Sequence, residues 1–212
     1  MSKVNGRFWT ADLHLGDPKV ADIRGFASVR EHDTAIISQL AELGPFAEVW
    51  VLGDISRGRR EEEEAAMELL GSHLVEAELH LIAGNHDSVS SINKNGFKRQ
   101  RRWLQTFDSV QQFGRVKLSG TNVLMSHFPF ARSGDGPGRS DPWKGRHNEF
   151  RLPDTGLPLI HGHTHHVRPH MIAARECWSK SLLDLTQFCV SWDAHRGLVS
   201  EHTLNQWIEG IK

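Results

Sequence analysis

The sequence predicts an α/β fold in which two β-sheets pack together, and three observations support this. Short apolar runs at residues 7–11, 48–52 and 78–83 have the length and composition of buried strands. Between them, residues 29–43 and 61–74 place apolar side chains at helical spacing. From about residue 115 onward, strand-like runs dominate. The first half therefore predicts a largely parallel sheet, and the second half predicts another sheet packed against it.

The remaining elements follow from local signals. Gly44-Pro45 is expected to end the first helix, and the acidic residues at 61–64 suit the start of the second. Strands of the second sheet are expected at residues 122–126, 157–160 and 185–192, and a short helix or tail at residues 201–211. A basic segment rich in glycine and proline predicts a long loop at about residues 131–154. Residues 1–212 are expected to form a single domain.

The composition excludes several classes of protein. The chain has 212 residues, of which 38% are hydrophobic and 24% charged, as in ordinary globular domains. A net charge of −1 argues against extended nucleic-acid binding. No apolar run reaches the roughly 18 residues of a membrane span, and no secretion signal follows the start, so we expect a cytoplasmic protein. Cys177 and Cys189 are expected to be buried, reduced thiols. The oligomeric state is left open.

Histidine is the unusual residue, with 14 copies, and it points to metal or proton chemistry. Five polar clusters each follow an apolar run: Asp12-Leu13-His14, Gly53-Asp54, Gly84-Asn85-His86-Asp87, Ser126-His127 and Gly162-His163-Thr164-His165. The carboxyl ends of strands in open α/β sheets meet at one crevice. We therefore expect all five clusters at a single site.

The side chains in these clusters suit metal binding. They supply two carboxylates, one amide oxygen and four imidazoles as candidate ligands. Mixed oxygen and nitrogen ligands favour divalent metals such as manganese, iron, cobalt or zinc. Seven ligands are too many for one tetrahedral ion but suit two ions that share a carboxylate. The glycines before Asp54, Asn85 and His163 would allow the backbone to approach closely.

The motifs D-x-H, G-D, G-N-H-[DE], H and G-H-x-H, in this order, resemble those of calcineurin-like metallophosphoesterases, most of all the small bacterial and phage-encoded members. The resemblance spans roughly residues 8–192. It implies a two-sheet sandwich flanked by helices, in four αββα layers. It also implies two divalent metal ions, with manganese preferred and iron, zinc, cobalt or nickel as alternatives.

The resemblance assigns a role to each candidate residue. The first metal would be held by Asp12, His14 and His165, and the second by Asn85, His127 and His163. Asp54 would bridge the two ions. His86 would be the catalytic histidine, beside the phosphoryl group and the leaving oxygen, where developing charge needs a proton donor.

The implied activity is that of a metal-dependent phosphoric ester hydrolase. A phosphodiesterase is favoured, acting on small nucleotide diesters such as cyclic nucleotides by attack of a metal-bound hydroxide. A nuclease or a phosphomonoesterase of the same superfamily is the alternative. A non-catalytic interaction module is a further alternative, although all seven ligand positions and His86 are present.

The sequence departs from the related phosphoprotein phosphatases at one place. Their second motif reads G-D-x-x-D-R-G, and its later aspartate orients the catalytic histidine. Here Arg57 stands where that aspartate would be. Protein phosphatase activity is therefore disfavoured and the partner of His86 is left open, with Asp87 as a candidate. Arg57 and His195 are candidate substrate contacts.

Overall fold

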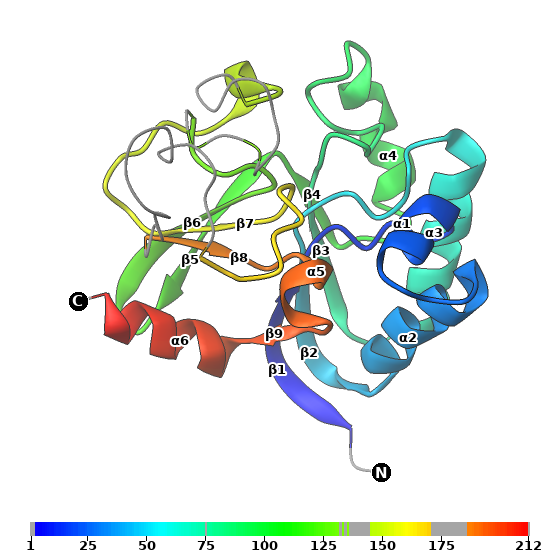
Figure 1. Ribbon diagram of the computed structural model, residues 1–212, viewed down its shortest axis with the longest axis horizontal. Helices are drawn as coiled ribbons and strands as arrows, with labels where there is room; N and C mark the ends of the chain where they lie inside the picture. Colours follow the sequence, from blue (N-terminus) through cyan, green and yellow to red (C-terminus); the bar gives the residue numbers. More distant parts are fainter. Residues whose placement is uncertain are drawn as a thin grey trace.

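Two β-sheets lie together with helices flanking them in the computed structural model (Figure 1). It describes residues 3–74, 76–131, 133, 135, 145–170 and 186–211. The first sheet has the order β4-β3-β2-β1-β9, and its strands are β1 (Val4–Thr10), β2 (Leu43–Val51), β3 (Glu78–Ile82), β4 (Ser109–Gln111) and β9 (Val199–Ser200). Strands β1 to β4 are parallel, and β9 pairs antiparallel with β1.

The second sheet has the order β5-β6-β7-β8, with strands β5 (Phe113–Leu118), β6 (Thr121–Ser126), β7 (Leu159–His161) and β8 (Gln187–Cys189). A hairpin joins β5 and β6, whereas β6, β7 and β8 are parallel. The α-helices are α1 (Pro18–Ile23), α2 (Val29–Ala41), α3 (Arg60–His73), α4 (Gln100–Trp103), α5 (Trp192–His195) and α6 (Glu201–Gly210). Two short 3-10 helices are η1 (Gly96–Arg99) and η2 (Asn148–Phe150).

The helices begin and pack as their sequences predict. The Ser28 hydroxyl accepts a hydrogen bond from the amide of Glu31 at 3.1 Å and so caps α2. Helix α2 buries Ile36 and Leu40, and α3 buries Leu70, in one core on the first sheet. Helices α1, α2 and α3 lie together on one side of the molecule, and α6 lies on the other (Figure 1).

A second core lies between the sheets, because side chains alternate faces along each strand. Trp9 of β1 joins Met125 and Ile160 of the second sheet there, whereas Val49 and Val51 of β2 face the helices. The expected α/β fold of two sheets flanked by helices is confirmed. Among the described residues, no helix is long and apolar enough to cross a bilayer.

Two expected boundaries were wrong. Helix α2 ends at Ala41, and Gly44-Pro45 lies inside β2, not at a helix end. Between the pairs Val4–Leu43 and Gly6–Ala47 the register shifts, and such an irregularity tolerates a proline that cannot donate to the ladder.

The expected strand at residues 185–192 is also shorter, because the chain turns into α5 at Trp192. Residue 185 lies outside the described residues, as do residues 132, 134 and 136–144 of the expected loop and Cys177. Cys189 is a buried free thiol, as expected. That the chain is one domain stays a prediction.

Candidate metal centre

The five polar clusters meet at the carboxyl ends of β1, β2, β3, β6 and β7, as the fold predicts. A cleft of about 550 Å³ opens there. Six of the eight predicted metal and catalytic residues line it: His14, Asp54, Asn85, His86, His163 and His165. The other two, Asp12 and His127, are buried next to them.

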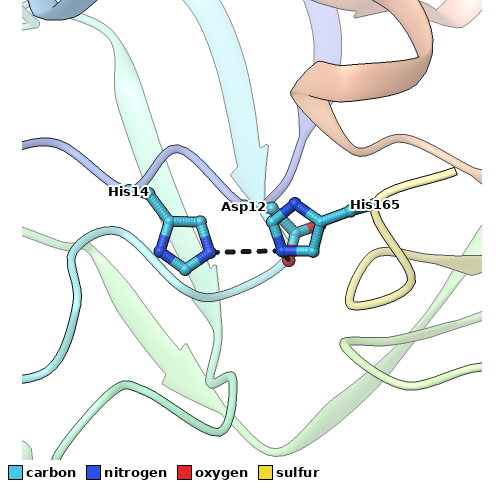
Figure 2. A group of neighbouring side chains, drawn as sticks. All are labelled: Asp12, His14 and His165. Carbon is cyan, nitrogen blue, oxygen red and sulfur yellow. Dashed lines mark hydrogen bonds and ion pairs between the residues drawn. The ribbon is translucent and has the colours of Figure 1, made fainter. Parts of the chain in front are cut away.

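The first group of donors consists of Asp12, His14 and His165, whose ligand atoms lie within 4.8 Å of one another (Figure 2). The Nε2 atoms of the two histidines are 3.3 Å apart, and His165 Nε2 is 3.7 Å from Asp12 Oδ1. Asp12 and His14 follow β1, whereas His165 follows β7. One donor group is therefore assembled from both sheets.

The second group consists of Asp54, His127 and His163, again with ligand atoms within 4.8 Å. Asn85 joins it, because its Oδ1 lies 3.1 Å from His127 Nε2. The Nδ1 atom of His127 donates to the carbonyl oxygen of Leu52 at 2.7 Å. The neutral ring therefore presents an unprotonated Nε2 to the group.

One carboxylate oxygen lies between the two groups. Asp54 Oδ2 is 4.0 Å from His14 Nε2 and 3.4 Å from His127 Nε2. Gly84 makes this approach possible, since a Cβ at that position would lie 2.3 Å from Asp54 Oδ1. The expected need for glycine here has a direct steric cause.

Unusual backbone angles concentrate at the same site. Left-handed φ values between 49° and 69° occur at five of the seven predicted ligands, namely Asp12, His14, Asp54, His163 and His165. This region is unfavourable for residues with a Cβ, and such conformations cluster at functional sites. The surrounding fold holds these side chains at the cost of local backbone strain.

The electrostatics of the site fit bound cations. Asp12 and Asp54 are both buried, and burial raises the pKa of each carboxyl. Their side-chain ion partners among the described residues are histidines, without lysine or arginine. Divalent cations would supply the missing positive charge. The donor set of carboxylate, amide and imidazole matches borderline first-row metals.

Two of the histidine ligands, His14 and His163, are also in the form that binds metals. Burial holds the pKa of His14 and of His163 well below the usual range. Both rings are therefore neutral near pH 7, as a metal ligand must be. His163 Nε2 also lies 3.4 Å from Asp135 Oδ1, a residue that the ligand motifs do not include.

His86 lies at the edge of both groups. Its amide donates to Asp54 Oδ1 at 2.8 Å, and its Nδ1 donates to the carbonyl oxygen of Arg57 at 3.0 Å. The ring also packs edge-on against His14, with centroids 5.4 Å apart. The main chain of Arg57 therefore orients His86 where the related phosphatases use an aspartate.

Asp87 was a candidate partner of His86, but its carboxylate bonds to main-chain amides of other residues. Its buried carboxylate accepts hydrogen bonds from the amides of Gly84, Asp54 and Ile55 at 2.7 to 3.2 Å. Burial, followed by the charge of Asp54, raises the pKa of Asp87 to about 7. Asp87 thus joins the loops after β2 and β3.

The two candidate substrate contacts differ in position. Arg57 lines the cleft, where its guanidinium also pairs with Glu62 at 2.6 Å. His195 does not line the cleft. Its Nε2 donates to the carbonyl oxygen of Cys189 at 2.8 Å, and its ring stacks on Phe188. The expected strand end at Trp192 is a helical turn, which takes His195 away from the site.

Sequence reasoning missed three residues of the site. Asp193 accepts a hydrogen bond from His165, Arg24 binds Asp193, and Asp135 faces His163. The segment Trp192–His195 carries a usable signal, because Asp193 lies two residues before the candidate His195. No local pattern marks Arg24, which lies in the turn after α1.

Comparisons with known proteins point in one direction. A family model described as calcineurin-like phosphoesterase matches residues 9–167. The Gene 66 protein of Mycobacterium phage L5 is 32% identical over 171 residues, covering 76% of this chain and 78% of that protein. The Gene 66 protein of Mycobacterium phage D29 is 36% identical over 165 residues, covering 74% and 77%.

A solved structure supports the fold. The protein of unknown function AQ665 from Aquifex aeolicus superimposes with a TM-score of 0.64 over 96% of this chain and 99% of that chain. The two sequences are 16% identical, so this likeness concerns the fold alone.

Proposed function

This chain belongs to the calcineurin-like phosphoesterase family, and on that premise we propose that it hydrolyses phosphodiesters at a centre of two divalent cations. The family consists of metal-dependent hydrolases of phosphoesters, and this chain retains candidate ligand groups for the metal. The proposal concerns the number of ions, the residue roles and the diester substrate.

The position of Asp54 carries the proposal. Its Oδ2 lies between His14 of the first donor group and His127 of the second. A carboxylate shared in this way is typical of two-metal hydrolases, in which the ions lie about 3.5–4 Å apart. The donors mix nitrogen and oxygen, which suits several first-row divalent metals. Among these, the family resemblance favours manganese, with iron, zinc, cobalt and nickel as alternatives.

Each donor group would hold one ion. Asp12, His14 and His165 would bind the first, and Asn85, His127 and His163 would bind the second. When bound, two such cations withdraw charge from phosphoryl oxygens and lower the pKa of coordinated water, so that hydrolysis proceeds near neutral pH.

His86 would act on the substrate directly. Because its Nδ1 donates to the Arg57 carbonyl, Nε2 is the ring atom left to contact a phosphoryl or leaving oxygen. A protonated Nε2 would stabilise negative charge there and could transfer its proton to the leaving group.

The cleft favours a small substrate. Its volume of about 550 Å³ is in the range of sites for small molecules. Lys19, Arg57, Arg146 and Arg196 line it and offer cationic groups to a phosphate, with Arg57 also paired to Glu62 and Arg146 to Asp135. A small nucleotide diester, including a cyclic nucleotide, fits this size better than an extended nucleic acid, and the cationic side chains suit its phosphate.

A substrate panel tests the proposal. Protein reconstituted separately with manganese, zinc, iron and magnesium would be assayed on bis-p-nitrophenyl phosphate, p-nitrophenyl phosphate, a cyclic nucleotide and short single-stranded DNA. We expect turnover of the aryl diester and the cyclic nucleotide, with manganese most effective.

The other outcomes separate the alternatives. Turnover of the monoester alone would identify a phosphomonoesterase, and preference for DNA a nuclease. Metal binding without turnover of any substrate in a broadened panel would favour an interaction module.

A further inference from the structure

We propose that Asp193 is a positioning residue for His165 and that Arg24 holds Asp193 in place. The inference rests on the proposed first metal group of Asp12, His14 and His165. It assigns a role to two residues, distant in sequence, that lie outside the ligand motifs.

The contact between Asp193 and His165 defines which nitrogen of the His165 ring is available to bind a metal. Asp193 Oδ2 lies 2.8 Å from His165 Nδ1, and an ionised carboxylate can only accept. Nδ1 therefore carries the proton. The other nitrogen, Nε2, faces His14 Nε2 at 3.3 Å and Asp12 Oδ1 at 3.7 Å. A carboxylate on the far nitrogen of a ligating histidine fixes both its tautomer and its orientation.

His165 needs this restraint more than the other histidine ligands do. Its side chain is 36% exposed, compared with 5% for His14, 1% for His127 and 2% for His163. Buried rings are held by packing on all sides. The ring of His165 is partly exposed and has less packing around it, so its hydrogen bond to Asp193 adds a restraint that packing alone does not supply.

Arg24 fixes the carboxylate in turn. Its Nε and Nη2 bind Asp193 Oδ1 and Oδ2 at 3.0 and 2.7 Å, in the two-pronged geometry that restricts a carboxylate most strongly. The Arg24 side chain is only 1% exposed. The guanidinium also donates to the carbonyl oxygens of Asp12 at 2.6 Å and Leu13 at 3.0 Å.

Arg24 therefore joins the two parts of the first donor group. It binds the main chain at Asp12, after β1, and through Asp193 it fixes His165, after β7. The far side of Arg24 is closed by His32 Nε2 at 2.8 Å, and His32 Nδ1 bonds Asp33 at 2.7 Å. The pair of His32 and Asp33 supplies a control, because the side-chain contacts of Asp33 are with His32 and the Gly16 amide and not with a proposed metal ligand.

The test measures metal affinity in a background with one donor group. His127→Ala removes a ligand of the second group and leaves the first intact. Calorimetric titration with Mn²⁺ would compare this variant with His127→Ala/Asp193→Ala and His127→Ala/Asp33→Ala. We expect Asp193→Ala to weaken binding roughly 10- to 100-fold. Asp33→Ala should weaken it far less, and Asp193→Asn, which keeps an acceptor oxygen, should recover part of the loss.

Equal affinities for the Asp193→Ala and Asp33→Ala variants would overturn the positioning role. Failure of His127→Ala itself to bind any metal would instead contradict the first donor group, and with it the proposed function and this inference.

A measurement on the unaltered chain covers the case in which Asp193→Ala does not fold. In zinc-loaded protein, nitrogen NMR of the His165 ring should show a proton on Nδ1 and zinc on Nε2. Zinc on Nδ1 would overturn the proposal.

Discussion

The imidazole of His86 donates from Nδ1 to the main-chain carbonyl oxygen of Arg57, 3.0 Å away. A backbone carbonyl thus orients the predicted catalytic histidine. The position of this carbonyl depends on the turn that contains Arg57. Gly58, the next residue, has a left-handed φ of 96°, and a Cβ there would lie 2.5 Å from the His86 carbonyl oxygen.

We expect Gly58→Ala to misplace His86 while leaving the metal in place. The turnover number should fall about 10- to 100-fold, which corresponds to roughly 1.4–2.7 kcal/mol of activation free energy. Metal content, measured by mass spectrometry, should not change. Gly120→Ala is the matched control, since Gly120 also has a left-handed φ, 79°, but open space around its Cβ position. A similar loss in both variants would show that backbone strain, not the contact with His86, is responsible.

Replacing His86 itself should separate catalysis from metal binding. His86→Ala removes the group that would stabilise the leaving oxygen, so we expect turnover to fall roughly 10²- to 10⁴-fold with both metal ions retained. The exposed His202 provides the control substitution, His202→Ala, which should not alter turnover. Turnover of His86→Ala at the level of the unaltered protein would exclude the assigned role.

His127→Ala should remove one ion and abolish activity. The ring is 1% exposed and is held by the Leu52 carbonyl, so no other side chain can take its place without rearrangement. We expect the metal content to fall from about two ions per chain to about one. Retention of both ions would show that His127 is not a ligand.

Metal binding should also stabilise the fold. Two buried carboxylates, Asp12 and Asp54, have histidines as their side-chain ion partners among the described residues. A ligand at 100 times its dissociation constant adds about 2.7 kcal/mol to the free energy of unfolding. We therefore expect Mn²⁺ to raise the melting temperature of the chelator-treated protein, and to raise that of Asp54→Asn less. An equal rise in both would contradict a shared ligand at Asp54.

Cys189 should be unreactive until the protein unfolds. Its side chain is fully buried, and burial raises the pKa of the thiol to about 12, so the nucleophilic thiolate is rare at neutral pH. In a Cys177→Ser background, a disulfide reagent should label Cys189 only at denaturant concentrations that also abolish the native circular dichroism signal. Rapid labelling of the native protein would show that β8 opens locally.

Much of the fold could be predicted because its elements are encoded locally. The apolar runs at β1, β2 and β3 and the helical spacing of α2 and α3 are properties of short segments, independent of distant contacts. The boundaries that failed depend on tertiary contacts. Pro45 is accommodated by the register shift against β1, and Trp192 begins a helix whose turn is capped by Ser191.

The motifs determined which residue types gather at the site, because strands of a parallel sheet bring their carboxyl ends together whatever their side chains are. That reasoning placed histidines 14, 86, 127, 163 and 165 in one region, and the structure brings all five there. It could not identify the groups that orient them. A carbonyl oxygen such as that of Arg57 exists at every position of a chain and leaves no mark in the sequence.

The sequence alone therefore determined the family, the placing of a polar cluster after each of five strands, and the chemistry of the donor set. Only the tertiary structure decided that Arg57 orients His86 through its main chain, that Arg24 joins Asp12 to Asp193, and that His195 turns away from the cleft. The physical reason is that hydrogen bonds of this kind depend on distance and direction between segments far apart in the chain, which no local pattern encodes.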